Sequence, residues 1–123
     1  MSEIDRDYIE PLIEEALRRV GYTHDFERDI MPMLLEERAQ WWCRDQGVII
    51  TELVQFPNFK VCNYWLVAGC LEDCLELQPE INRWAVAQGC SRAIGMGRRG
   101  WLRVLPKYGW KPYGIGFAKD LRQ

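Results

Sequence analysis

Residues 60–96 read KVCNYWLVAGCLEDCLELQPEINRWAVAQGCSRAIGM, and this stretch decides the fold. Its first part, Lys60–Val67, is rich in β-branched and aromatic residues, which favours a strand. Leu71–Gln88 carries apolar residues at helical spacing, and Gly89 follows it as a typical helix C-terminal residue. Ser91–Met96 reads as another strand. A strand, a helix and a strand in this order predict two parallel strands joined by a right-handed crossover.

The flanking segments add helices before this stretch and a helix and a strand after it. Apolar residues at helical spacing predict helices over Tyr8–Val20 and from Thr23, and residues 39–55 contain two strands separated by a turn. Gly100–Tyr108 reads as a short helix and Tyr113–Lys119 as a last strand. The predicted order is ααβββαβαβ, an α/β fold with a mixed, mostly antiparallel sheet flanked by helices.

We expect a single domain over residues 1–123, with a helical N-terminal part (1–38) and a sheet-containing core (39–121). The first residues are acidic rather than basic, so a secretory signal peptide is not expected. The longest apolar run is too short to cross a bilayer. The five cysteines are an odd number, which indicates reduced thiols in a cytosolic setting. His24 is the only histidine, and we expect no metal site.

Charge is distributed unevenly along the chain. Residues 1–90 carry 8 basic and 17 acidic side chains, whereas residues 91–123 carry 8 basic and 1 acidic. This asymmetry indicates either an anionic partner for the C-terminal segment or pairing of that segment with the acidic remainder of the fold. Basic and aromatic residues alternate over 98–111, which also suits single-stranded nucleic acid, although no nucleic-acid-binding fold is recognisable.

Two adjacent tryptophans indicate a surface for a protein partner or a second copy of the chain. Trp41 and Trp42 lie on a predicted strand, so their side chains face opposite sides of the sheet. One of them would then point away from at least one core layer, and tryptophan is enriched at protein interfaces. We therefore expect a protein–protein contact in this region.

The glycines of residues 95–100 match the pattern G-x-G-x-x-G, but their position excludes a dinucleotide-binding loop. That loop follows the first strand of a βαβ unit and needs a second parallel strand after its helix. Here the chain reaches residue 123 before such a unit is complete. Gly95, Gly97 and Gly100 are instead expected to let the chain leave a strand and enter a short helix.

The segment RRGWLRVLPKYGWKP (98–112) resembles part of the acyl-CoA N-acyltransferase (GNAT) superfamily, in which a short helix ends in a turn with a Leu-Gly-Phe-like sequence. Lys107 to Trp110 stand at the last four positions of that turn. The wider run, residues 39–121, resembles small GNAT-like proteins of tailed bacteriophages, some of them associated with the virion interior. The resemblance implies a GNAT-like fold, acetyl-CoA as cofactor, and a location in the host cytoplasm or the virion.

Two departures from the GNAT pattern change the expected function. The pyrophosphate-binding turn of the family has the pattern Q/R-x-x-G-x-G/A, whereas Val67–Asp73 has one glycine, no preceding basic residue, and two carboxylates that repel a phosphate. The tyrosine that serves the family as an acid falls on Leu105. The resemblance therefore implies a catalytically degenerate protein that acts through virion or host protein contacts. The alternative is an active N-acetyltransferase with a non-standard pyrophosphate loop.

If the cofactor binds, four residues are candidates for holding it. The backbone N–H groups of Gly69 and Cys70 precede the predicted long helix, where the family binds pyrophosphate. Arg98 and Arg99 follow the fourth strand, and arginine suits phosphate because of its fork of donors. The two arginines could equally pair with the carboxylates Glu72 and Asp73.

Glu52 is the candidate catalytic residue. It lies on the strand face shared by Val48, Ile50 and Val54, and a carboxylate buried on that face could act as a general base toward an amine. The alternative is a solvated strand face, or a carboxylate that meets an arginine.

Overall fold

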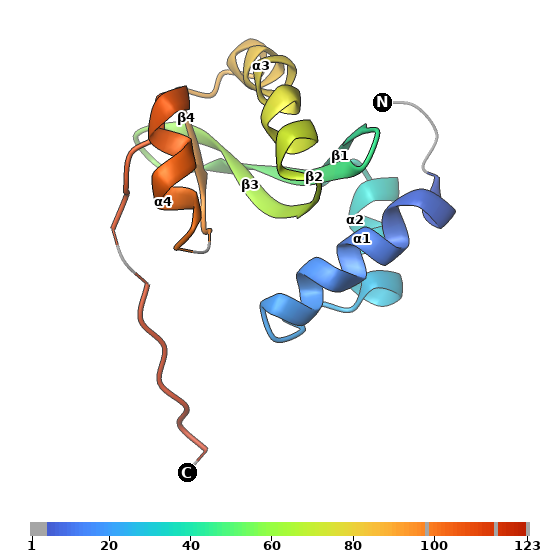
Figure 1. Ribbon diagram of the computed structural model, residues 1–123. Helices are drawn as coiled ribbons and strands as arrows, with labels where there is room; N and C mark the ends of the chain where they lie inside the picture. The colour runs from blue at the N-terminus through green and yellow to red at the C-terminus, as the bar shows by residue number, and fades with distance from the viewer. Residues whose placement is uncertain (1–4, 98, 115, 123) are drawn as a thin grey trace.

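The computed structural model describes residues 5–97, 99–114 and 116–122, which form an α/β fold around a four-stranded sheet (Figure 1). Its elements are α1 (Arg6–Arg19), the π-helical turn η1 (Phe26–Ile30), α2 (Met31–Leu35), β1 (Gln40–Arg44), β2 (Gly47–Gln55), β3 (Lys60–Gly69), α3 (Leu71–Ala87), β4 (Arg92–Gly95), α4 (Trp101–Val104) and the 3-10 turn η2 (Leu105–Tyr108). The strands lie in the order β1-β2-β3-β4. β1, β2 and β3 are antiparallel, and β4 is parallel to β3, so the predicted parallel strand–helix–strand unit is confirmed.

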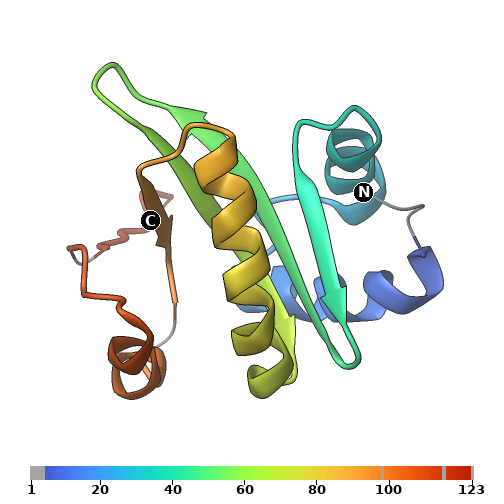
Figure 2. The same ribbon diagram turned by 90° about the horizontal axis from the view of Figure 1, so that it is seen from above.

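Helices cover both faces of the sheet: α1 and α2 lie on one face and α3 on the other (Figures 1 and 2). Buried side chains between α1, α2 and the sheet form a first cluster, here named the α1-side core: Ile9, Ile13, Ala16, Leu17, Phe26, Ile30, Met31, Leu34, Ala39, Val48, Ile50, Leu66 and Ala68. The second, the α3-side core, buries Ile49, Cys62, Tyr64, Cys74, Leu77, Ile81, Ala85 and Cys90. Successive side chains of β2 alternate between the two cores, as a strand buried on both faces requires.

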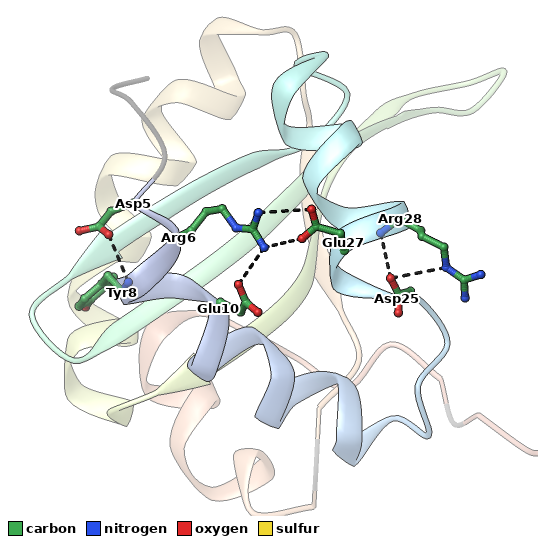
Figure 3. Close-up of polar contacts among 7 residues, drawn as sticks. All are labelled: Asp5, Arg6, Tyr8, Glu10, Asp25, Glu27 and Arg28. Carbon is green, nitrogen blue, oxygen red and sulfur yellow. Dashed lines mark hydrogen bonds and ion pairs between the residues drawn. The ribbon is translucent and has the colours of Figure 1, made fainter.

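Polar contacts fix the start of α1 and join it to η1 (Figure 3). The side chain of Asp5 accepts a hydrogen bond from the backbone N–H of Tyr8 and caps the helix. Arg6 forms ion pairs with Glu10 on its own helix and with Glu27 on η1. These contacts are exposed, so they orient the two helices while apolar burial supplies the main stabilisation.

The adjacent tryptophans both contribute to the cores. Trp41 is half-buried against the α1-side core, and Trp42 is half-buried against the α3-side core. The indole of Trp42 meets Trp84 edge to face at 5.3 Å and donates a hydrogen bond to Thr51. Helices cover both faces of the sheet, so each ring packs partly against a core and keeps part of its surface exposed. A protein partner or a second copy of the chain stays a prediction.

The predicted last strand over residues 113–119 is absent among the described residues of that range, and the observed order is ααβββαβα. The described residues after η2 have no regular structure and lead away from the sheet (Figure 1). Tyr113, Phe117 and Leu121 are largely exposed. Gly114 and Gly116 occupy alternate positions, so one face of a strand here would have few side chains to bury.

The described residues contain neither a membrane-spanning helix nor a cluster of metal-ligating side chains. No helix there combines the length and apolar character needed to cross a membrane. No three His, Cys, Asp or Glu side chains in the same part of the chain are grouped so that they could hold a metal ion.

Candidate functional site

β3 and β4 are paired over only part of their length, and they part at Tyr64. Val61–Tyr64 pair with Arg92–Gly95, after which β4 ends while β3 continues to Gly69. A β-bulge lies at the same point: Trp65 has no partner in β2, because the partners of its two neighbours are adjacent. Trp65 and Leu66 consequently both pack on the α1-side core.

A cavity of about 300 Å³ lies where the two strands part. Residues 64–67 of β3 and the segment that follows β4 form its middle. Arg19, at the end of α1, and Val20, which follows that helix, line the cavity from one face of the sheet. Leu75 and Gln78 of α3 line it from the other. α4 and η2 complete its wall. Figure 2 shows α3 and α4 beginning at the edge where β3 and β4 end. The cavity therefore lies at the carboxyl ends of two parallel strands, a usual place for ligands in α/β folds.

Two hydrogen bonds between side chains organise the α3 side of the cavity. The indole N–H of Trp110 donates to Oε1 of Gln78 at 2.7 Å, and the hydroxyl of Tyr64 donates to Oδ1 of Asn82 at 2.6 Å. The rings of Tyr64 and Trp110 meet edge to face at 5.2 Å. Because Gln78 and Asn82 are one helical turn apart, both bonds attach this wall to the same face of α3.

The two ionisable groups that line the cavity on the α3 side are held neutral. Burial raises the pKa of Tyr64, with a smaller contribution from Cys62. Burial also raises the pKa of the Cys74 thiol to about 11. At neutral pH both groups keep their protons, so neither is a thiolate or phenolate nucleophile.

The start of α3 is occupied by the turn between β1 and β2. The backbone N–H of Cys70 donates to the carbonyl oxygen of Gln46 at 2.8 Å, and the N–H of Gln46 donates to the carboxylate of Asp73 at 2.9 Å. Gly69 has φ +91°, and a Cβ there would lie 2.0 Å from the Gln46 oxygen. The glycine is thus required by a positive φ and by the close approach of the turn.

This contact bears directly on the predicted cofactor residues. The Cys70 N–H already has a partner within the protein, so it would have to release Gln46 to bind a phosphate. Asp73 accepts from the backbone of the same turn rather than from an arginine. Arg99 is exposed in the turn that leads into α4 and does not line the cavity, and Arg98 lies outside the described residues. Cofactor binding by these residues stays a prediction.

Glu52 lies on β2, apart from the cavity lining. Its side chain is half-buried and accepts a hydrogen bond from the amide of Asn63 at 3.0 Å. Among the described residues, the Glu52 carboxylate is therefore neither fully solvated nor paired with an arginine. Its role as a general base stays a prediction. Because Glu52 does not line the cavity, a substrate would have to extend past the cavity wall to contact it.

Leu105, to which the sequence resemblance assigns the position of the GNAT tyrosine, lines the cavity. Leu105 therefore forms part of the cavity wall, but a leucine side chain has no acidic proton to donate. The hydroxyl that the described lining does contain belongs to Tyr64.

Sequence reasoning missed the residues that shape this site. The bulge at Trp65 has no local sequence pattern, and the contact of Gln46 with α3 joins segments far apart in the chain. Gln78 did offer a signal, because it is a polar residue on the apolar face of α3 between Cys74 and Ile81. A polar side chain on a buried face needs partners, and it often marks a site.

Solved structures with low sequence identity share this architecture. An acetyltransferase from Trypanosoma brucei is 13% identical with a TM-score of 0.67, over 96% of each chain. Aminoglycoside N-acetyltransferase AAC(6′)-Iy, solved with CoA, is 11% identical with a TM-score of 0.67, over 98% of this chain and 92% of its own. A GNAT family acetyltransferase from Staphylococcus aureus is 12% identical with a TM-score of 0.58, over 96% of this chain and 95% of its own.

Comparison at the level of sequence adds nothing to this: no protein-family model and no curated protein matches the chain. The structural likeness extends over nearly the whole chain. The chain has the α/β fold of the GNAT acetyltransferases.

Proposed function

We propose that the chain binds an acyl-CoA in the cavity between β3 and β4 and transfers the acyl group to an amine. The cavity is the observation that supports this proposal. It lies at the carboxyl ends of two parallel strands, and residues from both faces of the sheet line it. Bound acetyl-CoA would supply a thioester. The amine nitrogen would form a C–N bond with the thioester carbonyl carbon, and the C–S bond of the thioester would break. The proton lost by the amine would pass to the CoA thiolate.

The cavity suits the pantetheine arm of the cofactor. Its α3 side combines aromatic and aliphatic walls (Tyr64, Trp101, Trp110, Leu105) with the amide of Gln78. Apolar walls with a few placed polar groups are typical of sites for small organic ligands. The pantetheine arm is a flexible chain with two neutral amides, so it matches a lining of this kind.

The start of α3 fits the pyrophosphate poorly. The Cys70 N–H is already bonded to Gln46, and the carboxylates of Glu72 and Asp73 would repel a phosphate. The phosphates are therefore expected to lie toward the basic start of α4, where Arg99 is exposed. Arg99→Ala should weaken CoA binding, whereas Arg83→Ala, a matched change on the exposed face of α3, should not.

The residues of the site also limit the proton transfers that it can support. The raised pKa of Tyr64 keeps its hydroxyl protonated, so it can donate a proton but cannot serve as a base. That proton is donated to Asn82 in the present arrangement. Deprotonation of the amine is thus left to Glu52 or to solvent.

Acetyl transfer to a panel of amines tests the proposal, with the released CoA thiol as the readout. Leu75→Trp would fill the cavity from α3, and Leu71→Trp places the same side chain on the exposed start of that helix. We expect transfer by the wild type and by Leu71→Trp, and loss of transfer in Leu75→Trp. Equal activity in the two variants would show that the cavity does not hold the cofactor.

The second candidate is a non-catalytic protein that acts through protein contacts. Two observations favour it: Leu105 in place of a hydroxyl, and a helix start closed by Gln46. A bacteriophage origin and a virion or host partner belong to this candidate and rest on the sequence resemblance alone. Turnover of acetyl-CoA with any amine would exclude it.

A further inference from the structure

The side-chain amide of Gln78 is held in one orientation, and this orientation is fixed by its partner. An indole N–H can only donate a hydrogen bond. The atom of Gln78 that faces Trp110 at 2.7 Å must therefore be the carbonyl oxygen Oε1. The NH₂ group of Gln78 then lies on the other branch of the amide, away from that bond.

Among the described residues, the NH₂ group of Gln78 has no hydrogen-bond partner. The residue is only 8% exposed and lines the cavity. The buried, unpartnered side-chain atoms of the described residues do not include this nitrogen, so the NH₂ group keeps contact with the space of the cavity and can exchange solvent for a ligand acceptor. The group thus remains available to an acceptor atom that enters the cavity.

The surroundings of Gln78 define the chemistry of that acceptor. The α3 side of the cavity presents Tyr64 and Trp110, whose polar atoms already have protein partners. Leu75 and Leu105 add aliphatic surface. A neutral donor within such a wall favours a neutral carbonyl oxygen over a phosphate, since none of the described residues on this side of the lining is cationic.

We infer that Gln78 is a positioning residue for the cofactor: its NH₂ group donates to an amide carbonyl of the pantetheine arm, and Trp110 fixes its orientation. The inference rests on the proposed function and assigns it a specific contact. The contact would hold the arm against α3 and so fix how far the thioester extends toward the other face of the sheet.

Paired variants test this contact by calorimetric titration with CoA. Gln78→Glu keeps an acceptor for Trp110 and removes the NH₂ donors. Gln88→Glu makes the same change of charge at the exposed C-terminal end of α3. Gln78→Met removes the donors without adding charge. Both Gln78 variants should weaken CoA binding by roughly two- to tenfold, the usual contribution of one hydrogen bond, and Gln88→Glu should bind as the wild type does.

A spectroscopic readout distinguishes a contact from a structural effect. The side-chain ¹⁵NH₂ resonances of Gln78 are identified by their absence from the spectra of Gln78→Glu. They should shift when CoA is added to the wild type and stay in place with adenosine 3′,5′-bisphosphate, which lacks the pantetheine arm.

The outcomes separate this inference from the function on which it rests. If the wild type and both Gln78 variants bind CoA equally, Gln78 does not position the cofactor, while the proposed function stands. If CoA binds but the Gln78 resonances do not move, the contact is likewise refuted. If the wild type shows no saturable binding of CoA, both proposals fail.

Discussion

Gly69→Ala tests the contact between the β1–β2 turn and the start of α3. Gly69 has φ +91°, and an added Cβ would lie 2.0 Å from the carbonyl oxygen of Gln46, a backbone atom that cannot rotate away. Gly89 has the same φ of +91°, but nothing lies within 4 Å of an added Cβ. The two substitutions therefore share the cost of the backbone conformation and differ in the clash.

The expected magnitudes follow from this difference. A side chain at a left-handed φ costs about 1–2 kcal/mol, and both variants should lose this amount. Gly69→Ala must also displace Gln46, which breaks its bonds to Cys70 and Asp73. Net hydrogen-bond contributions are about 0.5–1.5 kcal/mol, so Gly69→Ala should lose about 1–3 kcal/mol more than Gly89→Ala.

Urea unfolding of the two variants and the wild type measures the difference under one set of conditions. A larger loss in Gly69→Ala, with an unchanged dependence on denaturant, would support the close approach of the turn. Equal losses in the two variants would refute it, because the clash would then contribute nothing. The same protein samples, titrated with CoA, would show whether displacing Gln46 frees the start of α3 for phosphate.

Three further predictions concern the thiols and the charged contacts. Cys70 is exposed whereas Cys74 is buried, so brief treatment with iodoacetamide should modify Cys70 well before Cys74, as peptide mass spectrometry would show; faster labelling of Cys74 would contradict its burial. Burial raises the pKa of Cys74 from 9.0 to about 11, so the contribution of the protonated thiol to stability is complete below pH 9 and is lost as pH rises toward 11. The melting temperature should therefore fall between pH 9 and pH 11. A melting temperature that does not change over this window would contradict the shift. Arg6→Ala removes exposed ion pairs, including that to Glu27, so it should change stability only slightly and not at all in high salt; a large, salt-independent loss would show that Arg6 packs rather than pairs.

The sequence was sufficient to predict the elements whose apolar periodicity is strong. β3, α3 and β4 form as predicted from residues 60–96; β3 and α3 bury regular stripes of side chains, whereas β4 is short and no more than half-buried. The parallel pairing of β3 and β4 follows from the handedness of such connections. The predicted GNAT-like architecture rested in addition on the resemblance of residues 39–121, and of the segment 98–112 in particular, to that superfamily.

The last strand and the details of the site could not be predicted in this way. Residues 113–119 alternate like a strand, but their glycines leave little to bury, and local alternation does not supply a neighbouring strand. A cofactor contact at Gly69 stays a prediction, and sequence reasoning did not show that a distant turn, through Gln46, requires a glycine at this position. Trp65 becomes a bulge because of pairing with β2, which no window of sequence reveals.

Calorimetric titration of the wild type and of Leu75→Trp with acetyl-CoA tests the central claim, that the cavity between β3 and β4 holds the cofactor. We predict saturable binding to the wild type, with one site per chain, and loss of that binding in Leu75→Trp while Leu71→Trp retains it. An absence of binding to the wild type at millimolar acetyl-CoA, or equal binding to all three proteins, would contradict the claim.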